Sequence, residues 1–209
     1  MSTARSETAI VLLEAAQRCV QRHGVAGLST RKVAEEAGMP LSQIHYHLGS
    51  KRGLLLALLA YQNEKLLARQ EAMYARPQPL WERWMQACDY LDEDLASGYV
   101  RILQEMIAAG WSDPEIASEA RRNLQGWSEL LTQVATEAAE RLGGLGPLAP
   151  VQAAALVGCV FLGAEALILL GFTEEQLPAR SALRKVGELL RTFESEPSGA
   201  RHARSRTDG

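Results

Sequence analysis

Apolar residues recur at spacings of three and four along most of the chain, which is the period of an amphipathic α-helix. In residues 6–23, for example, Ile10, Leu13 and Ala16 share one face, and Gly24 then supplies the residue type that commonly ends a helix. The sequence lacks runs that alternate apolar and polar positions, as a half-buried strand requires. The pattern therefore predicts an all-α protein.

Glycine, proline and short polar residues divide this pattern into about nine helices. Ser29 or Thr30 is suited to cap the second helix and Ser50 the fourth, because their hydroxyls can accept hydrogen bonds from free N–H groups. Pro40 suits the first turn of the third helix, where its missing N–H costs nothing. The expected ranges are 6–23, 29–36, 40–48, 51–74, 80–96, 99–109, 114–142, 150–170 and 179–194.

The segment 28–55 contains two short amphipathic helices that meet at Ala37 and Gly38. A polar face distinguishes the second of them, and Lys51 follows it within about one helical turn. This arrangement is typical of a helix-turn-helix, whose second helix lies in the major groove of DNA. The polar face consists of Ser42, Gln43, His45, Tyr46 and His47.

The net charge of −3 is unevenly distributed along the 209 residues. Residues 1–53 carry 7 Lys or Arg and 4 Asp or Glu, a balance of +3, whereas residues 54–196 carry 12 and 20, a balance of −8. Residues 197–209 carry 3 and 1, a balance of +2. A small basic region on an acidic body fits a protein that contacts phosphate at one end.

Cys19, Cys88 and Cys159 are widely spaced and odd in number, and the first apolar run lacks the features of a signal peptide. We therefore expect reduced thiols in a cytoplasmic protein. Residues 151–172 approach the length of a membrane span, but Glu165 lies near their middle. A helix that is apolar on all sides can equally be buried between protein helices, and we favour that interpretation.

The sequence lacks the common motifs of catalysis and of metal or cofactor binding. It has no paired-cysteine metal spacing, no G-x-S-x-G and no glycine loop that cradles phosphate. The glycines between Gly143 and Pro147 follow one predicted helix and precede another, which indicates a linker. We therefore predict that the protein is not an enzyme and uses no cofactor or metal.

A set of residue types at fixed spacing extends from residue 10 to residue 55. It comprises Val11, Ala15, Gly24, the run from Ser29 to Ala34, Ala37-Gly38, the run from Ile44 to Leu48, and Ser50-Lys51 with Leu54. This set resembles the DNA-binding domain of the TetR family of transcriptional regulators. The family often has Tyr in place of His45, Phe in place of Leu48 and a serine-like cap in place of Pro40.

The resemblance implies a division of the chain into three parts. Residues 1–50 would form a helix-turn-helix DNA-binding domain with three helices, and residues 51–195 a larger helical domain for ligand binding and dimerisation. Residues 196–209 lack apolar periodicity, which predicts a disordered tail.

The N-terminal part of a recognition helix faces base edges, which makes Leu41, Ser42 and Gln43 candidates for base contacts. His45 is a further candidate for the groove, and Arg31 could reach a base or a phosphate. The resemblance implies that other positions hold the sugar-phosphate backbone, which their hydroxyl, imidazole and ammonium groups suit. These positions are Thr30, Tyr46, His47 and Lys51. The alternative for Leu41, Ser42, Gln43, His45 and Lys51 is an ordinary solvated surface.

The resemblance also implies that the body dimerises. Apolar stripes on the last two helices independently favour a dimer interface, because such surfaces rarely face water, although both could be buried within one subunit. The stripes consist of Val151, Ala155, Gly158, Leu162 and Ala166 on one helix, and of Leu183, Val186, Leu189 and Leu190 on the other.

A small effector is the third expected partner. An acid in an apolar helix must find a partner or raise its pKa, so Glu165 could anchor a cationic ligand or pair with an arginine or a helix N-terminus. Aromatic and apolar residues on separate predicted helices could line a ligand site or fill a core. The candidates are Tyr61, Trp84, Cys88, Met106, Trp127, Phe161 and Glu165.

These features together predict a homodimeric TetR-type regulator, a repressor that a small apolar or amphipathic ligand releases from a pseudo-palindromic operator. Its partners would be double-stranded operator DNA, a second copy of the chain and the effector, with no membrane involved. The alternative is a helical small-molecule binding or scaffold protein that does not bind an operator.

Overall fold

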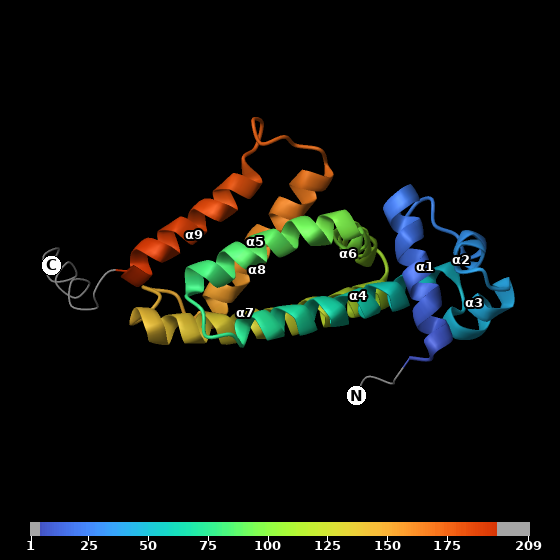
Figure 1. Cartoon of the computed structure of the whole chain (residues 1–209), viewed down its shortest axis with the longest axis horizontal. Coiled ribbons are helices and arrows are strands. Elements are labelled where there is room, and N and C mark those ends of the chain that lie inside the picture. The colour runs from blue at the N-terminus through green and yellow to red at the C-terminus, as the bar shows by residue number, and fades with distance from the viewer. Residues whose placement is uncertain (1–4, 196–209) are drawn as a thin grey trace, which may run out of the picture. The chain divides into compact units, whose positions relative to one another are not determined.

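The computed structural model describes residues 5–195, which form nine α-helices and no β-strand (Figure 1). The prediction of an all-α protein with nine helices is confirmed, whereas the predicted disordered tail, 196–209, lies outside the described residues. The helices are α1 (Glu7–His23), α2 (Thr30–Ala37), α3 (Leu41–Leu48), α4 (Lys51–Tyr74), α5 (Leu80–Ser97), α6 (Tyr99–Gly110), α7 (Pro114–Leu142), α8 (Pro150–Leu169) and α9 (Ala179–Ser195).

The chain divides into two compact units. The first holds the chain up to Leu67 together with Glu93–Leu124, and the second holds Ala68–Asp92 together with the chain from Gln125. Helices α4, α5 and α7 therefore contribute a segment to each unit. A functional boundary after residue 50 stays a prediction.

In the first unit, α1 packs on α2 and α3, and α2 packs on α3. The core between them includes Leu12, Leu13, Val33 and Ile44, which are all fully buried. Each of these side chains contributes about 1.5–3 kcal/mol when it leaves water. The short helices α2 and α3 are thus held by burial against α1, since eight residues make too few hydrogen bonds to be stable alone.

Gly38 makes the turn between α2 and α3. It adopts a left-handed conformation, with φ 64° and ψ 30°, and its N–H reaches back to the carbonyls of Ala34 and Glu35. The N–H of Met39 also bonds to the Ala34 carbonyl, at 3.0 Å, which closes the end of α2. Pro40 stands one position before α3 rather than inside its first turn, because its extended backbone, ψ 142°, is that of a cap residue.

An ion-pair cluster joins α1 to α2. Arg18 Nε and Arg22 Nη1 each lie 2.7 Å from the Glu36 carboxylate. The hydrogen bond from Arg22, and then that from Arg18, hold the pKa of Glu36 below its ordinary value. The carboxylate therefore stays charged in the folded protein at a lower pH than in the unfolded chain.

In the second unit, α9 lies close to α5 and packs on α8. A Cβ added at Gly187 would lie only 2.7 Å from Met85 Sδ, so glycine permits this approach. The indole N–H of Trp84 donates to the Leu183 carbonyl at 2.6 Å. At the other end of α9, the Glu194 carboxylate accepts hydrogen bonds from the first backbone N–H groups of α5, at 2.9 and 3.0 Å, and so caps that helix.

Glu36→Gln should make the free energy of unfolding less dependent on pH in the acid range. A carboxylate whose folded pKa is lowered contributes stability that is present above its unfolded pKa and is lost as pH falls through the folded pKa. The free energy of unfolding, measured by urea denaturation at successive pH values, should depend less on pH in this variant below about pH 4–5. Glu35→Gln is the control, because the Glu35 side chain is 70% exposed and, within residues 5–195, pairs with Arg31 alone. The same pH dependence of the free energy of unfolding in both variants at acid pH would contradict this role for Glu36.

Candidate nucleic-acid interface and ligand cavity

Helix α3 presents opposite faces to the core and to solvent. Ile44 is fully buried against the first unit, and this contact fixes the rotation of the helix. On the other side, Leu41 is 40% exposed and Tyr46 is 83% exposed. Ser42 and His45 are also exposed, and Gln43 is half-buried. The face predicted to read base edges is therefore the accessible face of α3.

The two histidines of α3 already have partners within the first unit. His45 Nδ1 lies 2.9 Å from the Gly49 carbonyl, at the end of its own helix. His47 Nδ1 lies 3.3 Å from Ser6 Oγ, the cap residue of α1, and the His47 ring makes an edge contact with Tyr46 at 4.8 Å between centroids. Only Nε2 of His45 is left to contact a base. The side chain can therefore offer one ring nitrogen to the major groove, and not two as the sequence alone allowed.

The cations near α3 differ in how freely they can meet phosphate. Lys51 is exposed at the first residue of α4 and makes no ion pair with any residue between 5 and 195. Arg31 is 84% exposed and contacts Glu35 only at 3.7 Å. Arg52, in contrast, is held by Asp113 at 2.7 Å and by Glu115 at 2.8 Å. Among the described residues near α3, Lys51 is therefore an unpaired cation, and Arg31 is only loosely paired.

The start of α2 is organised by Ser29 rather than by Thr30. Ser29 Oγ accepts a hydrogen bond from the N–H of Lys32 at 3.2 Å, which makes Ser29 the N-cap. Thr30, the first residue of α2, is half-buried, and its role at the sugar-phosphate backbone stays a prediction.

Three of the predicted ligand residues pack on one another in the second unit. The ring of Phe161 lies 5.6 Å from that of Trp84 and 6.4 Å from that of Trp127, both in edge-to-face geometry. Trp127 also donates its indole N–H to Gln70 at 3.1 Å. These rings fill space in the core, which was the other outcome considered for them.

The other four predicted ligand residues are divided between the units. Tyr61 and Met106 belong to the first unit, where the Tyr61 hydroxyl donates to Glu14 at 3.2 Å and Met106 is buried. Cys88 and Glu165 belong to the second unit, and both are buried. Burial raises the pKa of the Cys88 thiol to about 11.

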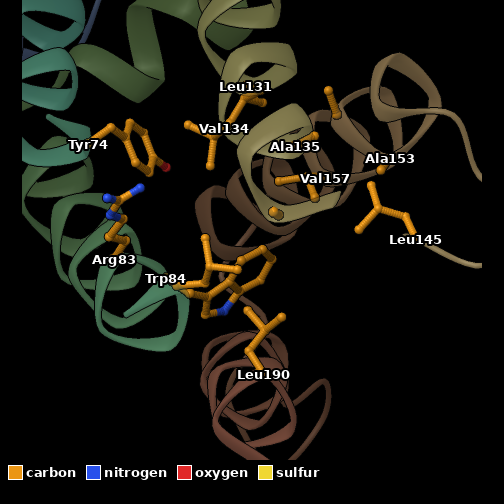
Figure 2. Close-up of a pocket in the computed structure, with 13 residues that line it drawn as sticks. Tyr74, Arg83, Trp84, Leu131, Val134, Ala135, Leu145, Ala153, Val157 and Leu190 are labelled. Carbon is orange, nitrogen blue, oxygen red and sulfur yellow. The ribbon is translucent and has the colours of Figure 1, made fainter. Parts of the chain in front are cut away.

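A cavity of about 170 Å³ lies within the second unit (Figure 2). Trp84 is the one predicted ligand residue on its wall, and Leu190, predicted for the dimer interface, lines it too. Apolar side chains make most of the wall, whereas Tyr74 and Arg83 are placed at one end (Figure 2). The full lining is Tyr74, Leu80, Arg83, Trp84, Leu131, Val134, Ala135, Ala138, Leu145, Ala153, Ala154, Val157 and Leu190.

Arg83 is a buried cation, with 3% of its surface exposed. Its Nη1 donates to the Glu137 carboxylate at 2.6 Å and its Nη2 to the Arg76 carbonyl at 2.7 Å, while its Nε has no partner. The hydrogen bond from Arg83 is the main cause that lowers the pKa of Glu137. Sequence analysis missed Arg83, although it lies three residues after Leu80 on the buried face of α5, where an arginine is unusual.

Burial also governs Tyr74. It raises the pKa of the Tyr74 hydroxyl to about 12, and the charge of Arg83 opposes this only in part. The hydroxyl therefore stays protonated at neutral pH and can donate a hydrogen bond. It makes none within the part of the chain that the structure describes.

The outer face of α8 is apolar and uncovered. The helix is long and apolar enough to cross a membrane, and 22% of its most apolar window is buried inside the chain. Val151 is 58% exposed, Leu156 54% and Val160 52%, and Cys159 is exposed between the last two. On α9 the corresponding exposed residues are Leu189 and Phe193.

This face is rotated relative to the stripe predicted from sequence. A Cβ at Gly158 would meet Trp127 at 3.6 Å and Leu131 at 3.8 Å, so Gly158 faces its own subunit. Leu183 is 3% exposed, and Leu190 lines the cavity. Of the other predicted residues, Val151, Ala155 and Leu189 are exposed, and Leu162, Ala166 and Val186 are half-buried.

Comparison with known proteins agrees with this architecture. Residues 12–58 match the model of the bacterial regulatory proteins of the tetR family. No curated protein sequence matches the chain.

Several solved structures share the fold. A TetR-family transcriptional regulator from Pectobacterium atrosepticum has 22% identity and a TM-score of 0.67, with 91% of this chain and 96% of that chain covered. FadR from Bacillus subtilis, solved with stearoyl-CoA, has 16% identity and a TM-score of 0.69, with coverage of 87% and 96%. A transcriptional regulator from Saccharomonospora viridis, solved with choline, has 19% identity and a TM-score of 0.70, with coverage of 90% and 96%.

The α2–turn–α3 geometry and the exposed face of α3 define a helix-turn-helix DNA-binding protein. The matched segment includes this whole motif, and the nine helices follow the fold of the related structures. Residues 12–58 therefore match the tetR family of bacterial regulatory proteins, and the chain as a whole shares the fold of solved TetR-family transcriptional regulators.

Gln43→Ala and Lys51→Ala should weaken DNA binding in different ways. Loss of Gln43 should relax discrimination at one operator position, at a cost of roughly 1–3 kcal/mol, because only a base contact reads sequence. Loss of the free cation Lys51 should weaken binding to all sequences alike and lower the slope of log affinity against log salt by about one unit. Fluorescence anisotropy with operator and scrambled duplexes over a salt series measures both effects.

Arg52→Ala is the matched control for Lys51→Ala, because Arg52 is the next residue and its charge is engaged by Asp113 and Glu115. Its salt slope should remain near that of the unmodified protein. A Gln43→Ala variant that weakens cognate and scrambled DNA equally would exclude Gln43 from base readout.

Proposed function

We propose that this TetR-family DNA-binding regulator is a homodimeric repressor, released from a pseudo-palindromic operator by a small, mostly apolar ligand. The observation that carries the proposal is the pairing of an accessible recognition helix with a cavity in the second unit that retains unused polar groups. We place the protein in the cytoplasm, where its DNA is.

Support for the DNA contacts comes from the geometry of the first unit. Leu41, Ser42 and Gln43 occupy the first turn of α3, the part of a recognition helix that faces base edges. Tyr46 is the most exposed residue of this helix among the large apolar ones, and Lys51 lies at the N-terminus of the next helix. A cation at a helix N-terminus opposes the helix dipole, which a phosphate bound at the same place would relieve.

Support for the dimer comes from the outer faces of α8 and α9. Leu156, Val160, Leu189 and Phe193 leave large apolar areas on neighbouring helices of the same unit, without a charged side chain on the exposed part of α8. Soluble proteins rarely leave such a surface in water, and a second copy of the chain would cover it symmetrically. Two recognition helices could then enter successive major grooves, as a palindromic operator requires.

Support for an effector comes from the cavity and from the related structures. Two regulators with this fold were solved with stearoyl-CoA and with choline, which are chemically unlike. The fold therefore does not select one ligand class, and the residues on the cavity wall must do so. Ligand binding would shift the dimer between two states that differ in the spacing of their helix-turn-helix domains. The state that the ligand favours would have a spacing that does not fit the operator.

The central experiment is a gel shift with DNA from upstream of the gene that encodes this protein. Specific retardation of that fragment, and not of a scrambled one, is expected, together with a protected region that is an inverted repeat. A chain that binds small molecules but retards neither fragment would overturn the proposal and favour a helical binding protein without an operator.

Val160→Arg should convert the dimer to a monomer. The substitution places a long charged side chain on an apolar face, where burial against a second copy would leave the charge unpaired. Analytical ultracentrifugation should show a monomer. Affinity for the operator should fall strongly, because a single helix-turn-helix domain contacts only one half of the palindrome. The control is Trp111→Arg, at a side chain that is 85% exposed in the first unit. A folded Val160→Arg protein that sediments as a dimer would place the interface elsewhere.

The native cysteines offer a second measurement of this interface. Cys159 is exposed on α8, whereas Cys19 and Cys88 are buried with raised pKa values and should react slowly with a maleimide. Cys159 should therefore be protected in the unmodified protein and react rapidly in Val160→Arg. Rapid labelling of Cys159 in both proteins would argue against α8 as the interface.

A further inference from the structure

The cavity in the second unit is lined by two side chains with unused hydrogen-bond donors, of which the Tyr74 hydroxyl can also accept. Tyr74, Arg83 and Trp84 are the side chains on its wall that carry polar atoms. The Trp84 indole N–H is already bonded to the Leu183 carbonyl, so its ring acts as apolar wall. Among residues 5–195, the Tyr74 hydroxyl and Arg83 Nε have no hydrogen-bond partner, and the two residues lie close enough for the charge of Arg83 to affect Tyr74.

A buried donor without a partner is costly, because it has given up water without replacement. Arg83 is nearly inaccessible, and its Nη1 and Nη2 each make one hydrogen bond, to Glu137 and to the Arg76 carbonyl. Arg83 lies on the cavity wall, and its Nε, which has almost no accessible surface, would bond to an entering group after a small shift of the side chain. The partner that Arg83 Nε–H requires is a hydrogen-bond acceptor, such as a carbonyl or a carboxylate oxygen of the ligand.

The local charge favours an acceptor that is itself negative. Glu137 pairs with both Arg83 and Arg141, so the three side chains together carry one net positive charge. The pKa of Glu137 is lowered by these arginines, which keeps the carboxylate ionised and the sum unchanged at neutral pH. A cation placed beside Arg83 would instead meet like charge in a poorly solvated site.

The size of the cavity limits the rest of the ligand. A volume of about 170 Å³ is close to that of an engineered apolar cavity of roughly 150 Å³ that binds benzene. Leu131, Val134, Val157 and Leu190 contribute branched apolar side chains to its wall. The space therefore suits one ring or a short branched alkyl group with one small substituent.

We propose that the cavity binds a small aromatic or branched aliphatic molecule whose one polar group is an oxygen acceptor held by Tyr74 and Arg83, with a carboxylate bound more tightly than a neutral carbonyl. This inference rests on the proposed function, of which it names the effector class. It replaces the cationic ligand at Glu165 expected from sequence, because Glu165 does not line this cavity.

Four probes of similar size distinguish the chemistry: benzoate, acetophenone, ethylbenzene and benzylammonium. Calorimetric titration into the full-length protein at neutral pH should rank their affinities with benzoate first and acetophenone second. Ethylbenzene should bind roughly tenfold or more weakly than benzoate, because it leaves both donors unsatisfied. Benzylammonium should bind most weakly. Equal or tighter binding of ethylbenzene or benzylammonium would overturn the proposal.

Tyr74→Phe isolates one donor, since it keeps the ring and removes only the hydroxyl. Benzoate affinity should fall about tenfold, whereas ethylbenzene affinity should not fall. Tyr90→Phe is the matched control, because Tyr90 belongs to the same unit, packs against Arg69 and does not line the cavity. Arg83→Lys keeps the charge beside Glu137 but removes Nε, and it should reduce the preference for benzoate over ethylbenzene. If Arg83→Lys does not fold, Tyr74→Phe alone still tests whether the cavity binds the oxygen acceptor of the ligand.

Adding the operator separates this inference from the proposed function. Benzoate that binds in a manner dependent on Tyr74, yet leaves operator affinity unchanged, would support the ligand class and count against the effector role of the cavity. Release of the operator by benzylammonium, with no binding of benzoate, would support an effector-responsive repressor and overturn the ligand class. An unchanged affinity of Tyr74→Phe for benzoate would also overturn the proposed ligand class.

Discussion

A buried arginine needs a partner for its charge, and this need organises the second unit. Arg83 meets Glu137 of α7 with one nitrogen and the carbonyl of Arg76, just beyond the end of α4, with another. Arg141 adds a second bond to Glu137 and donates to the carbonyl of Gln78 at 3.0 Å. Removing Glu137 would leave the buried charge of Arg83 without its ion-pair partner, which is destabilising, so this pair holds α5 against α7. The cavity beside Arg83 is a consequence of that arrangement.

The second constraint is the apolar character of α8, which offers more apolar surface than one subunit covers. Phe161 and Ala164 are buried by their own chain, while Leu156 and Val160 on the opposite side remain open. The buried face holds the aromatic core with Trp84 and Trp127. One helix can thus serve both the interior of a subunit and, on the proposal made here, its contact with a second copy.

The first unit divides its polar residues between structure and recognition. Ser29, Glu36 and His47 are engaged in caps and ion pairs that hold the three helices of the head together. Ser42 and Lys51 keep their polar groups free at the surface. Because the structural residues fix the rotation of α3 without using its outer face, the residues on that face can change while the fold is kept.

The sequence by itself determined the all-α class, the limits of the nine helices to within a few residues, and the helix-turn-helix, since all of these follow from local periodicity and from caps such as Ser29 and Gly38. The outer face of α8 could not be derived in this way. A helix that is apolar on every side gives no preferred direction, so the contacts of Gly158 with Trp127 and Leu131 decided which side faces inward. The same holds for the cavity, because Arg83 and Glu137 are separated by 54 positions in the chain. Only the packing of helices distant in sequence brought a buried cation, its partner and a free tyrosine hydroxyl to one place.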